Sequence, residues 1–199
     1  MLFRKVRRAM WGHKKVYFAC VFLIACGILN FVSMSAAVDG LEQAMVSFYD
    51  EYRVADIYAS VSAANVSNVE GLRNIEGIRG VSSRTVMDVR TEVAGSDKII
   101  KLRLITLDPM EHERINDIKI SGALPSDNTD IIVNIAFLEA HNLESGDSIT
   151  LFAGGKKVDY EVTGSFLSPE YVYVAEDLLP NPEGFGIAYI TAKGMEAVT

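Results

Sequence analysis

The feature that most constrains this chain is an uncharged, predominantly apolar run from Val16 to Val38. At about 1.5 Å per residue it would form a helix of roughly 34 Å, which is enough to cross a hydrocarbon core of about 30 Å. The first 15 residues hold six Lys and Arg and no acid, whereas Asp39 and Glu42 follow the run. Because Lys and Arg beside a span resist translocation, the sequence predicts a cytoplasmic N-terminus and an external C-terminal part.

A cleaved signal peptide is the competing interpretation, because Ser35 and Ala37 are small residues at a plausible cleavage spacing. Against it, the apolar run is longer than the roughly 7 to 15 residues of a signal core. Apolar residues also continue at helical spacing beyond the run, at Val38, Leu41, Met45, Phe48 and Tyr52. The sequence therefore favours an uncleaved membrane helix over residues 16–38 that extends into a helical stalk over residues 39–54.

Residues 1–15 form a basic arm that mixes apolar side chains with its charges, namely Leu2, Phe3, Val6, Met10 and Trp11. This mixture is typical of an amphipathic helix at a lipid interface. One interpretation is a topology signal with an interfacial tryptophan. The other adds a cytoplasmic partner, which would contact Arg4, Arg7, Arg8 and Trp11.

Charge and cysteine content bound the function of the external part, residues 55–199. The net charge is -7, and removing the arm's six bases from the total of 19 leaves 13 bases against 26 acids in residues 16–199. An acidic body argues against nucleic acid as a partner, because phosphate attracts basic surfaces. Both cysteines, Cys20 and Cys26, lie within the predicted span, so the external domain should fold without disulfides.

Alternating and capped segments predict an α+β domain with mixed sheets and short helices. Helices are expected over 68–76, behind a Ser67–Glu70 capping box, and from an Asn134 cap to His141. The irregular stretch Pro109–Pro125 could divide two subdomains, and Ala192–Thr199 resembles the start of a helix. Strands are expected at 56–62, 81–93, 99–107, 130–133, 148–153, 158–162 and 185–191.

Residues able to carry chemistry do not converge in the sequence. His112 and His141 lie far apart without metal-ligand spacing, and Glu111-His112-Glu113 is interpreted as a solvated loop. The sequence contains no Gly-x-Ser-x-Gly motif and no phosphate-binding Gly-x-x-x-x-Gly-Lys-Ser/Thr motif. We therefore expect no enzyme activity, no cofactor and no metal, and an anchored hydrolase is the least favoured alternative.

Two stretches, together with the order of parts, resemble the FtsX-like permeases of ABC transporters, whose first membrane helix precedes a MacB-like extracytoplasmic core domain. One stretch runs from Gly122-Ala-Leu-Pro125 through Asp130–Asn134 to Leu143–Leu151. It is similar to the family's Gly-x-x-Pro loop, short strand, small helix and Gly-Asp turn.

The second stretch is Ser165–Tyr173, in which Pro169 is predicted to bend the chain. We interpret Glu170, Tyr171 and Tyr173 as candidate contacts for a partner. The alternative is a well-packed structural corner, because tyrosines pack more often than they recognise.

The resemblance implies a non-catalytic subunit in a bacterial cell membrane. It implies partnership with a cytoplasmic ABC ATPase, with membrane lipid, and with the remaining permease helices or a second permease copy. Family members continue into at least three further membrane helices, so the end at Thr199 suggests a fragment. The alternative from another class is a freestanding, membrane-anchored binding or scaffold domain.

Overall fold

The computed structural model describes residues 2–93, 100–111, 114–171 and 179–199. Contacts divide the chain into two compact units, Met1–Phe48 and Tyr49–Thr199, and each is described by itself.

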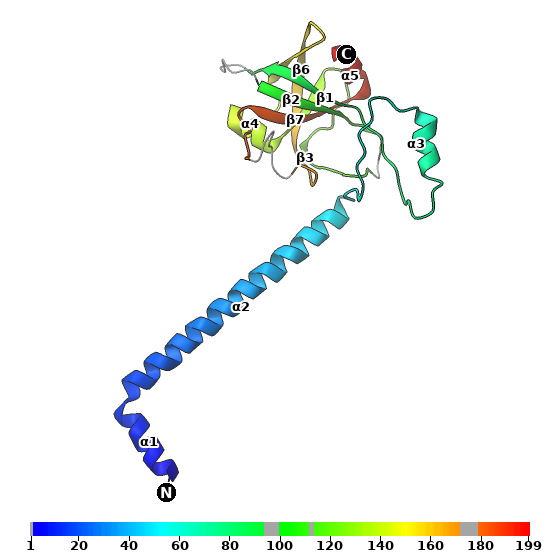
Figure 1. Ribbon diagram of the computed structural model, residues 1–199. Coiled ribbons are helices and arrows are strands. Elements are labelled where there is room, and N and C mark those ends of the chain that lie inside the picture. Colours follow the sequence, from blue (N-terminus) through cyan, green and yellow to red (C-terminus); the bar gives the residue numbers. More distant parts are fainter. Residues whose placement is uncertain (1, 94–99, 112–113, 172–178) are drawn as a thin grey trace. The chain divides into compact units, whose positions relative to one another are not determined.

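Two helices make up the first unit (Figure 1). Helix α1 spans Leu2–Gly12, and α2 spans Lys14–Glu51, so the end of α2 belongs to the second unit. They are separated at His13, whose carbonyl accepts bonds from the N–H groups of Val16 and Tyr17 at 3.0 and 3.3 Å. Helix α2 is long and apolar enough to cross a membrane, with a mean hydropathy of 2.2 over its most apolar stretch.

The second unit is built on one seven-stranded sheet in the order β3-β6-β4-β7-β2-β1-β5. A further pairing between β5 and β6 closes six of these strands into a ring, and β3 adds to β6 outside it. Pairs β2–β7 and β4–β6 are parallel and the others are antiparallel. The strands are β1 (Val86–Glu92), β2 (Ile100–Thr106), β3 (Lys119–Gly122), β4 (Asp130–Asn134), β5 (Ser148–Ala153), β6 (Lys156–Leu167) and β7 (Phe185–Ile190).

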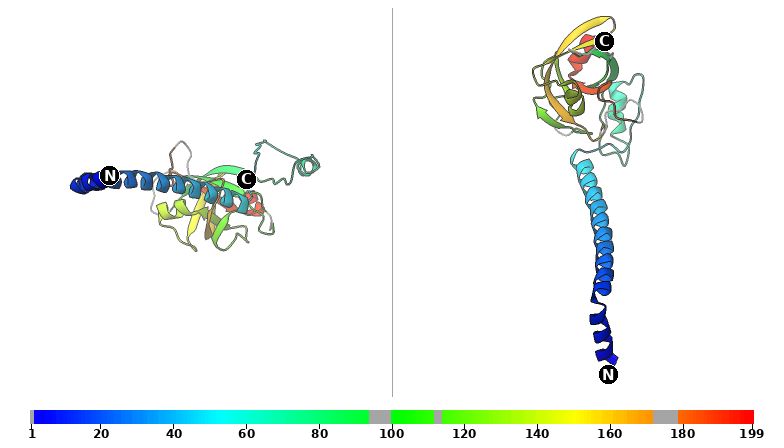
Figure 2. Two further views of the ribbon diagram at one scale, coloured as in Figure 1. Left: turned by 90° about the horizontal axis from the view of Figure 1, so that it is seen from below. Right: turned by 90° about the vertical axis from the view of Figure 1, so that its left-hand side faces the viewer.

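Apolar side chains fill both sides of this sheet. One cluster includes Leu102, Ile131 and Leu151, and it also receives Phe137 from α4 (Ile135–His141) and Met195 from α5 (Ala192–Val198). The ring of strands and α5 are seen along another direction in Figure 2. The second cluster, on the opposite side, consists of Ile105, Leu107, Ile118, Ile132, Phe166, Phe185, Ile187 and Tyr189. Strand β7 is consequently buried along its whole length.

Strands β3 and β6 approach so closely that the contact requires two glycines. Gly122 has φ +108°, and a Cβ built on it would lie 2.7 Å from both the Gly164 Cα and the Thr163 carbonyl oxygen. A Cβ on Gly164 would lie 2.6 Å from the Ser121 carbonyl oxygen. The glycine of the Gly-x-x-Pro stretch therefore serves this strand pairing.

The predicted α+β fold with a mixed sheet is confirmed, and most predicted strands are present. The predicted helix behind Asn134 and the hairpin turning at Gly154-Gly155 are also confirmed. Both glycines have positive φ, 56° and 78°, as a tight turn there requires. Strand β6 is longer than expected because its second half pairs with β3 and β4.

The strand predicted at 56–62 is wrong. That segment is irregular, with Ile57 85% and Val61 68% exposed, so the alternating pattern finds no sheet to join.

The capping-box prediction at Ser67 and Glu70 is also wrong. Helix α3 spans Val66–Leu72, and its N-cap is Asn65, whose side chain accepts from the Ser67 N–H at 3.2 Å. Asparagine is at least as good an N-cap as serine, so the helix begins two residues earlier than expected.

The polar stretch Pro109–Pro125 contains β3, which the sequence interpretation missed. Residues 49–199 form one compact unit, so this stretch does not divide two subdomains.

Candidate functional site

Helix α2 ends in a hydrogen-bonded turn that places Arg53 in the left-handed conformation, with φ 49°. The Val54 N–H donates to the Tyr49 carbonyl at 3.1 Å, and the Arg53 N–H donates to the Asp50 carbonyl at 3.3 Å. This pair of bonds is the Schellman arrangement, in which glycine normally occupies the position of Arg53. The helix therefore has a defined end.

The chain leaving α2 is bonded to the loop before β3. The N–H groups of Asn116 and Asp117 donate to the carbonyls of Arg53 and Tyr52, at 3.0 and 2.8 Å. The Arg53 Nε donates to the Arg114 carbonyl at 3.0 Å. These bonds connect residues about 60 positions apart in the sequence, and they attach the chain after α2 to the loop before β3. We call this bonded connection, between residues 52–53 and 114–117, the joint.

Asn116 is the centre of this joint. It is buried and left-handed, with φ 55°, which asparagine tolerates better than most residues. Its side-chain carbonyl accepts both from the Ala55 N–H at 2.8 Å and from the Tyr58 hydroxyl at 2.9 Å. One side chain thus bonds both the first and the last residue of the segment 55–58.

Beyond Tyr58 lies an ion pair between Arg84, before β1, and Glu170, after β6. The Arg84 guanidinium donates to Glu170 Oε1, and their side chains are only 25% and 14% exposed. Burial disfavours the charged form of Arg84, but the bond and charge of Glu170 outweigh it and raise the Arg84 pKa. The Ser168 hydroxyl accepts from the Glu170 N–H at 3.2 Å and orients the acid.

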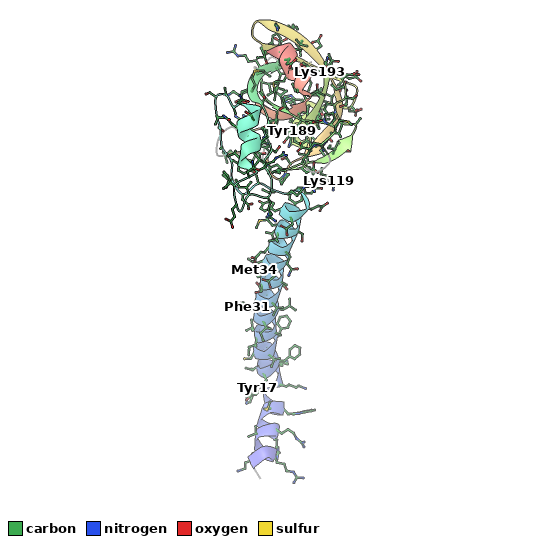
Figure 3. All side chains as sticks on the ribbon, turned by 90° about the vertical axis from the view of Figure 1, so that its right-hand side faces the viewer. Tyr17, Phe31, Met34, Lys119, Tyr189 and Lys193 are labelled. Atoms are coloured by element: carbon green, nitrogen blue, oxygen red, sulfur yellow. The ribbon has the colours of Figure 1, made fainter. Side chains whose placement is uncertain are left out.

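Three tyrosines surround this pair: Tyr58, Tyr171 and Tyr189. Burial, followed by the charge of Glu170, raises the pKa of Tyr58 and of Tyr171. Burial also raises the pKa of Tyr189, whose ring packs edge-on against Phe166 at 4.8 Å between centroids. Tyr189, on β7, is labelled in Figure 3. All three hydroxyls therefore stay protonated near neutral pH, and that of Tyr58 donates its proton to the Asn116 side-chain carbonyl.

We call the set Arg53, Tyr58, Arg84, Asn116, Glu170 and Tyr171 the junction cluster. It connects four separate segments: the end of α2, the entry to β1, the loop before β3 and the exit of β6. Its members are donors, acceptors and one ion pair, an arrangement suited to holding segments in position.

The sequence-predicted site residues fall in two places. Glu170 and Tyr171 lie in the junction cluster, where the Glu170 carboxylate accepts from Arg84. Tyr173 lies outside the described residues. Arg4, Arg7, Arg8 and Trp11 are exposed on α1 at the i, i+3, i+4, i+7 spacing of one helix face, with Trp11 74% exposed.

Arg84, Asn116 and Tyr58 were missed by sequence reasoning. Their roles depend on contacts between distant segments, which no local pattern encodes. The only local signal is Asn116-Asp117, a dipeptide typical of turns.

One groove is a weaker candidate. A groove of about 620 Å³ lies between the end of α4 and strands β3 and β6, lined by residues such as Leu138, Glu139 and Ser165. Among the described residues, no group of three or more His, Cys, Asp or Glu side chains could hold a metal ion. The lining residues of the groove include no Lys or Arg, so the groove lacks an ion pair like that of the junction cluster.

Among known proteins, this chain is similar to several solved structures. No family model and no curated protein matches this chain. The extracellular domain of the noncanonic ABC-type transporter YknZ from Gram-positive bacteria is 18% identical, with a TM-score of 0.43, over 73% of each chain. The periplasmic region of MacB from Actinobacillus actinomycetemcomitans is 13% identical, with a TM-score of 0.41, over 68% of this chain and 58% of that one.

Proposed function

We propose that this chain is the N-terminal portion of an FtsX/MacB-like ABC transporter permease subunit. In this proposal residues 1–15 are a cytoplasmic arm, 16–38 cross the cell membrane, 39–54 form a stalk, and 55–199 are an extracytoplasmic domain. The subunit is non-catalytic: a separate cytoplasmic ATPase drives movement of α2, and the junction cluster passes that movement to the external domain.

The main observation in support of this proposal is the joint, the set of hydrogen bonds between the chain after α2 and the loop before β3. A freestanding anchored domain needs only a tether, and a short polar linker would provide one. Here the helix continues to Glu51, ends in a Schellman turn, and is followed by residues bonded to the 114–117 loop. Such a joint is what transmission of movement requires.

The topology is supported by charge. The charged residues of the arm are all bases, and the first two charged residues after the apolar run, Asp39 and Glu42, are acidic. This asymmetry favours retention of the arm in the cytoplasm, where an ATPase would reach it. The same face of α1 that holds Arg4, Arg7, Arg8 and Trp11 is therefore proposed as the ATPase contact, with lipid along the apolar residues of the arm.

Co-purification tests the ATPase contact directly. The full chain, a variant lacking residues 2–12, and the Arg4→Ala/Arg7→Ala/Arg8→Ala variant would each be expressed with the proposed ATPase partner and isolated from membranes. We expect the last two to lose the ATPase, whereas Lys14→Ala/Lys15→Ala, which removes charge from another segment, retains it. Equal recovery of the ATPase with all variants would contradict the proposed contact.

A further inference from the structure

Three basic side chains and one aromatic ring form a single row across strands β2, β1, β5 and β6. Lys101 on β2 lies directly opposite Arg90 on β1. Arg90 also lies opposite Phe152 on β5, which in turn lies opposite Lys157 on β6. Because the side chains of directly paired residues project from the same face of a sheet, all four share one face. We call these four residues the cationic row.

The cationic row lies on the outer face of the ring of strands. Leu102 and Leu151, which are adjacent to members of the row in the sequence, point the other way into the core. Arg90 and Lys157 are exposed, and Phe152 is half-buried. A groove of about 620 Å³ is lined by the first three members of the row together with residues of the β5–β6 turn. A ligand could therefore reach the row from solvent.

The two acids of β1 on this face do not neutralise the cationic row. Both carboxylate oxygens of Asp88, which also lines the groove, accept from Arg103, at 2.8 and 3.0 Å. Glu92 approaches Lys157 only to 3.9 Å, and their side chains are 64% and 60% exposed, so this ion pair contributes little. Arg90 forms no hydrogen bond or ion pair with any residue that the structure describes.

The row also places like charges together in an acidic domain. Like charges directly opposite each other on neighbouring strands repel, and Arg90 and Lys101 are such a pair. The chain beyond the basic arm has only 13 bases against 26 acids, so a cluster of cations is a local exception. A bound anion would relieve the repulsion. Acids elsewhere on the domain would disturb it little, because charges are screened over about 8 Å at physiological ionic strength.

We propose that the cationic row binds an extended polyanion whose charged groups are phosphates. The row covers three strand spacings, which is about 14 Å along the sheet. A single ion would contact only part of it, whereas a polymer with repeating charges could contact every cation. Arginine binds phosphate through two parallel bonds and lysine binds it as a point charge, so the combination of Arg90 with Lys101 and Lys157 suits phosphate.

The proposed topology places the row outside the membrane, so the polymer would belong to the cell envelope. A lipid surface is a less suitable occupant. Peripheral binding to lipid uses exposed apolar residues, and the row contributes only the half-buried Phe152. The source of the polymer therefore rests on the proposed function, but its binding rests on the row alone.

Binding of fluorescent polyphosphate to the full chain tests the proposal. The chain would be reconstituted in sealed vesicles of neutral lipid and captured through a C-terminal tag, so that the basic arm, across the membrane, does not meet the probe. We expect Arg90→Gln/Lys157→Gln to weaken binding by about tenfold, because two phosphate contacts are lost. The matched control Arg79→Gln/Lys119→Gln removes the same charges from exposed residues outside the row and should bind like wild type.

The charge-conserving variant Arg90→Lys/Lys157→Arg should retain most of the binding, which separates a loss of charge from a folding defect. Equal weakening in the two Gln variants, weak binding by the charge-conserving variant, or no binding by wild type would overturn the proposal. Competition by inorganic phosphate as effective as that by unlabelled polyphosphate would reveal an adventitious ion only. Equally effective competition by phosphatidylglycerol vesicles would reveal a lipid site, and either result would also overturn the proposal. Loss of the ATPase contact with unchanged polyphosphate binding would refute the proposed function alone.

Discussion

At the scale of single residues, the junction cluster depends on side chains whose partners are remote in sequence. Arg84 and Glu170 are 86 positions apart, and each is mostly shielded from water. Asn116 accepts from residues 58 and 61 positions earlier. Glu170 and Tyr171 could be selected from a local stretch of sequence, but Arg84 and Asn116 could not, because folding alone brings them there.

The losses caused by substituting Arg84 and Glu170 should not be additive, because each single substitution leaves a partner without its bond. Glu170→Gln leaves the partly buried Arg84 without a counter-charge and should lower the free energy of unfolding by about 1.5–3 kcal/mol. The Arg84→Gln/Glu170→Gln double variant should lose less than the sum of the single variants, because the unpaired charge is gone. Urea unfolding of the full chain in detergent, monitored by the near-ultraviolet circular dichroism of tyrosine, measures these free energies of unfolding. Additive losses in the double variant would contradict an energetic coupling between Arg84 and Glu170.

At the scale of elements, prediction succeeded where a strand or helix carries its own signals. The Gly154-Gly155 turn and the Asn134 cap define β5, the start of β6 and α4 from local chemistry. Strand β3 has no such signal, because its existence depends on the Gly122–Gly164 contact with β6. The segment 56–62 shows the reverse error, since its alternation matches a strand but the sheet has no place for it.

Gly122→Ala tests the close approach of β3 and β6. Gly77→Ala is the matched control, because Gly77 also has positive φ, +94°, but open space around it. Both variants acquire backbone strain of roughly 1–2 kcal/mol. Only Gly122→Ala adds a clash with neighbouring backbone, which should cost about 1–3 kcal/mol more in unfolding free energy. Equal losses by the same unfolding assay would show that the contact is not tight.

Asp130, the first residue of β4, makes stability depend on pH. Burial opposes its ionisation, but bonds from the Asp127 N–H and from the Ser126 N–H and hydroxyl outweigh this and lower its pKa from 3.8. Because the pKa of Asp130 is lower in the folded state than in the unfolded state, its ionisation stabilises the folded state. This contribution to the free energy of unfolding is complete above about pH 4 and is lost as pH falls through the folded-state pKa.

Asp130→Asn removes this titration while keeping an acceptor oxygen. Unfolding free energies of wild type and variant, measured between pH 3 and 6, should therefore converge at the acid end. Curves that stay parallel throughout would show that Asp130 does not titrate differently on folding.

At the scale of the whole molecule, the basic arm, apolar run and mixed-sheet domain follow from charge, length and alternation in the sequence. The ring closure through β5 and β6 does not, because it depends on one long strand pairing with three neighbours. We propose that the joint after α2 passes movement from α2 to this domain.

Hydrogen exchange at the Asn116 and Asp117 amides tests that claim most directly, because these two N–H groups bond the carbonyls at the end of α2. Exchange would be measured in the membrane-embedded complex with its ATPase, with and without a non-hydrolysable ATP analogue. We expect nucleotide to change hydrogen exchange at these amides in wild type and not in the variant lacking residues 2–12. Identical exchange with and without nucleotide, in a complex that retains the ATPase, would contradict it.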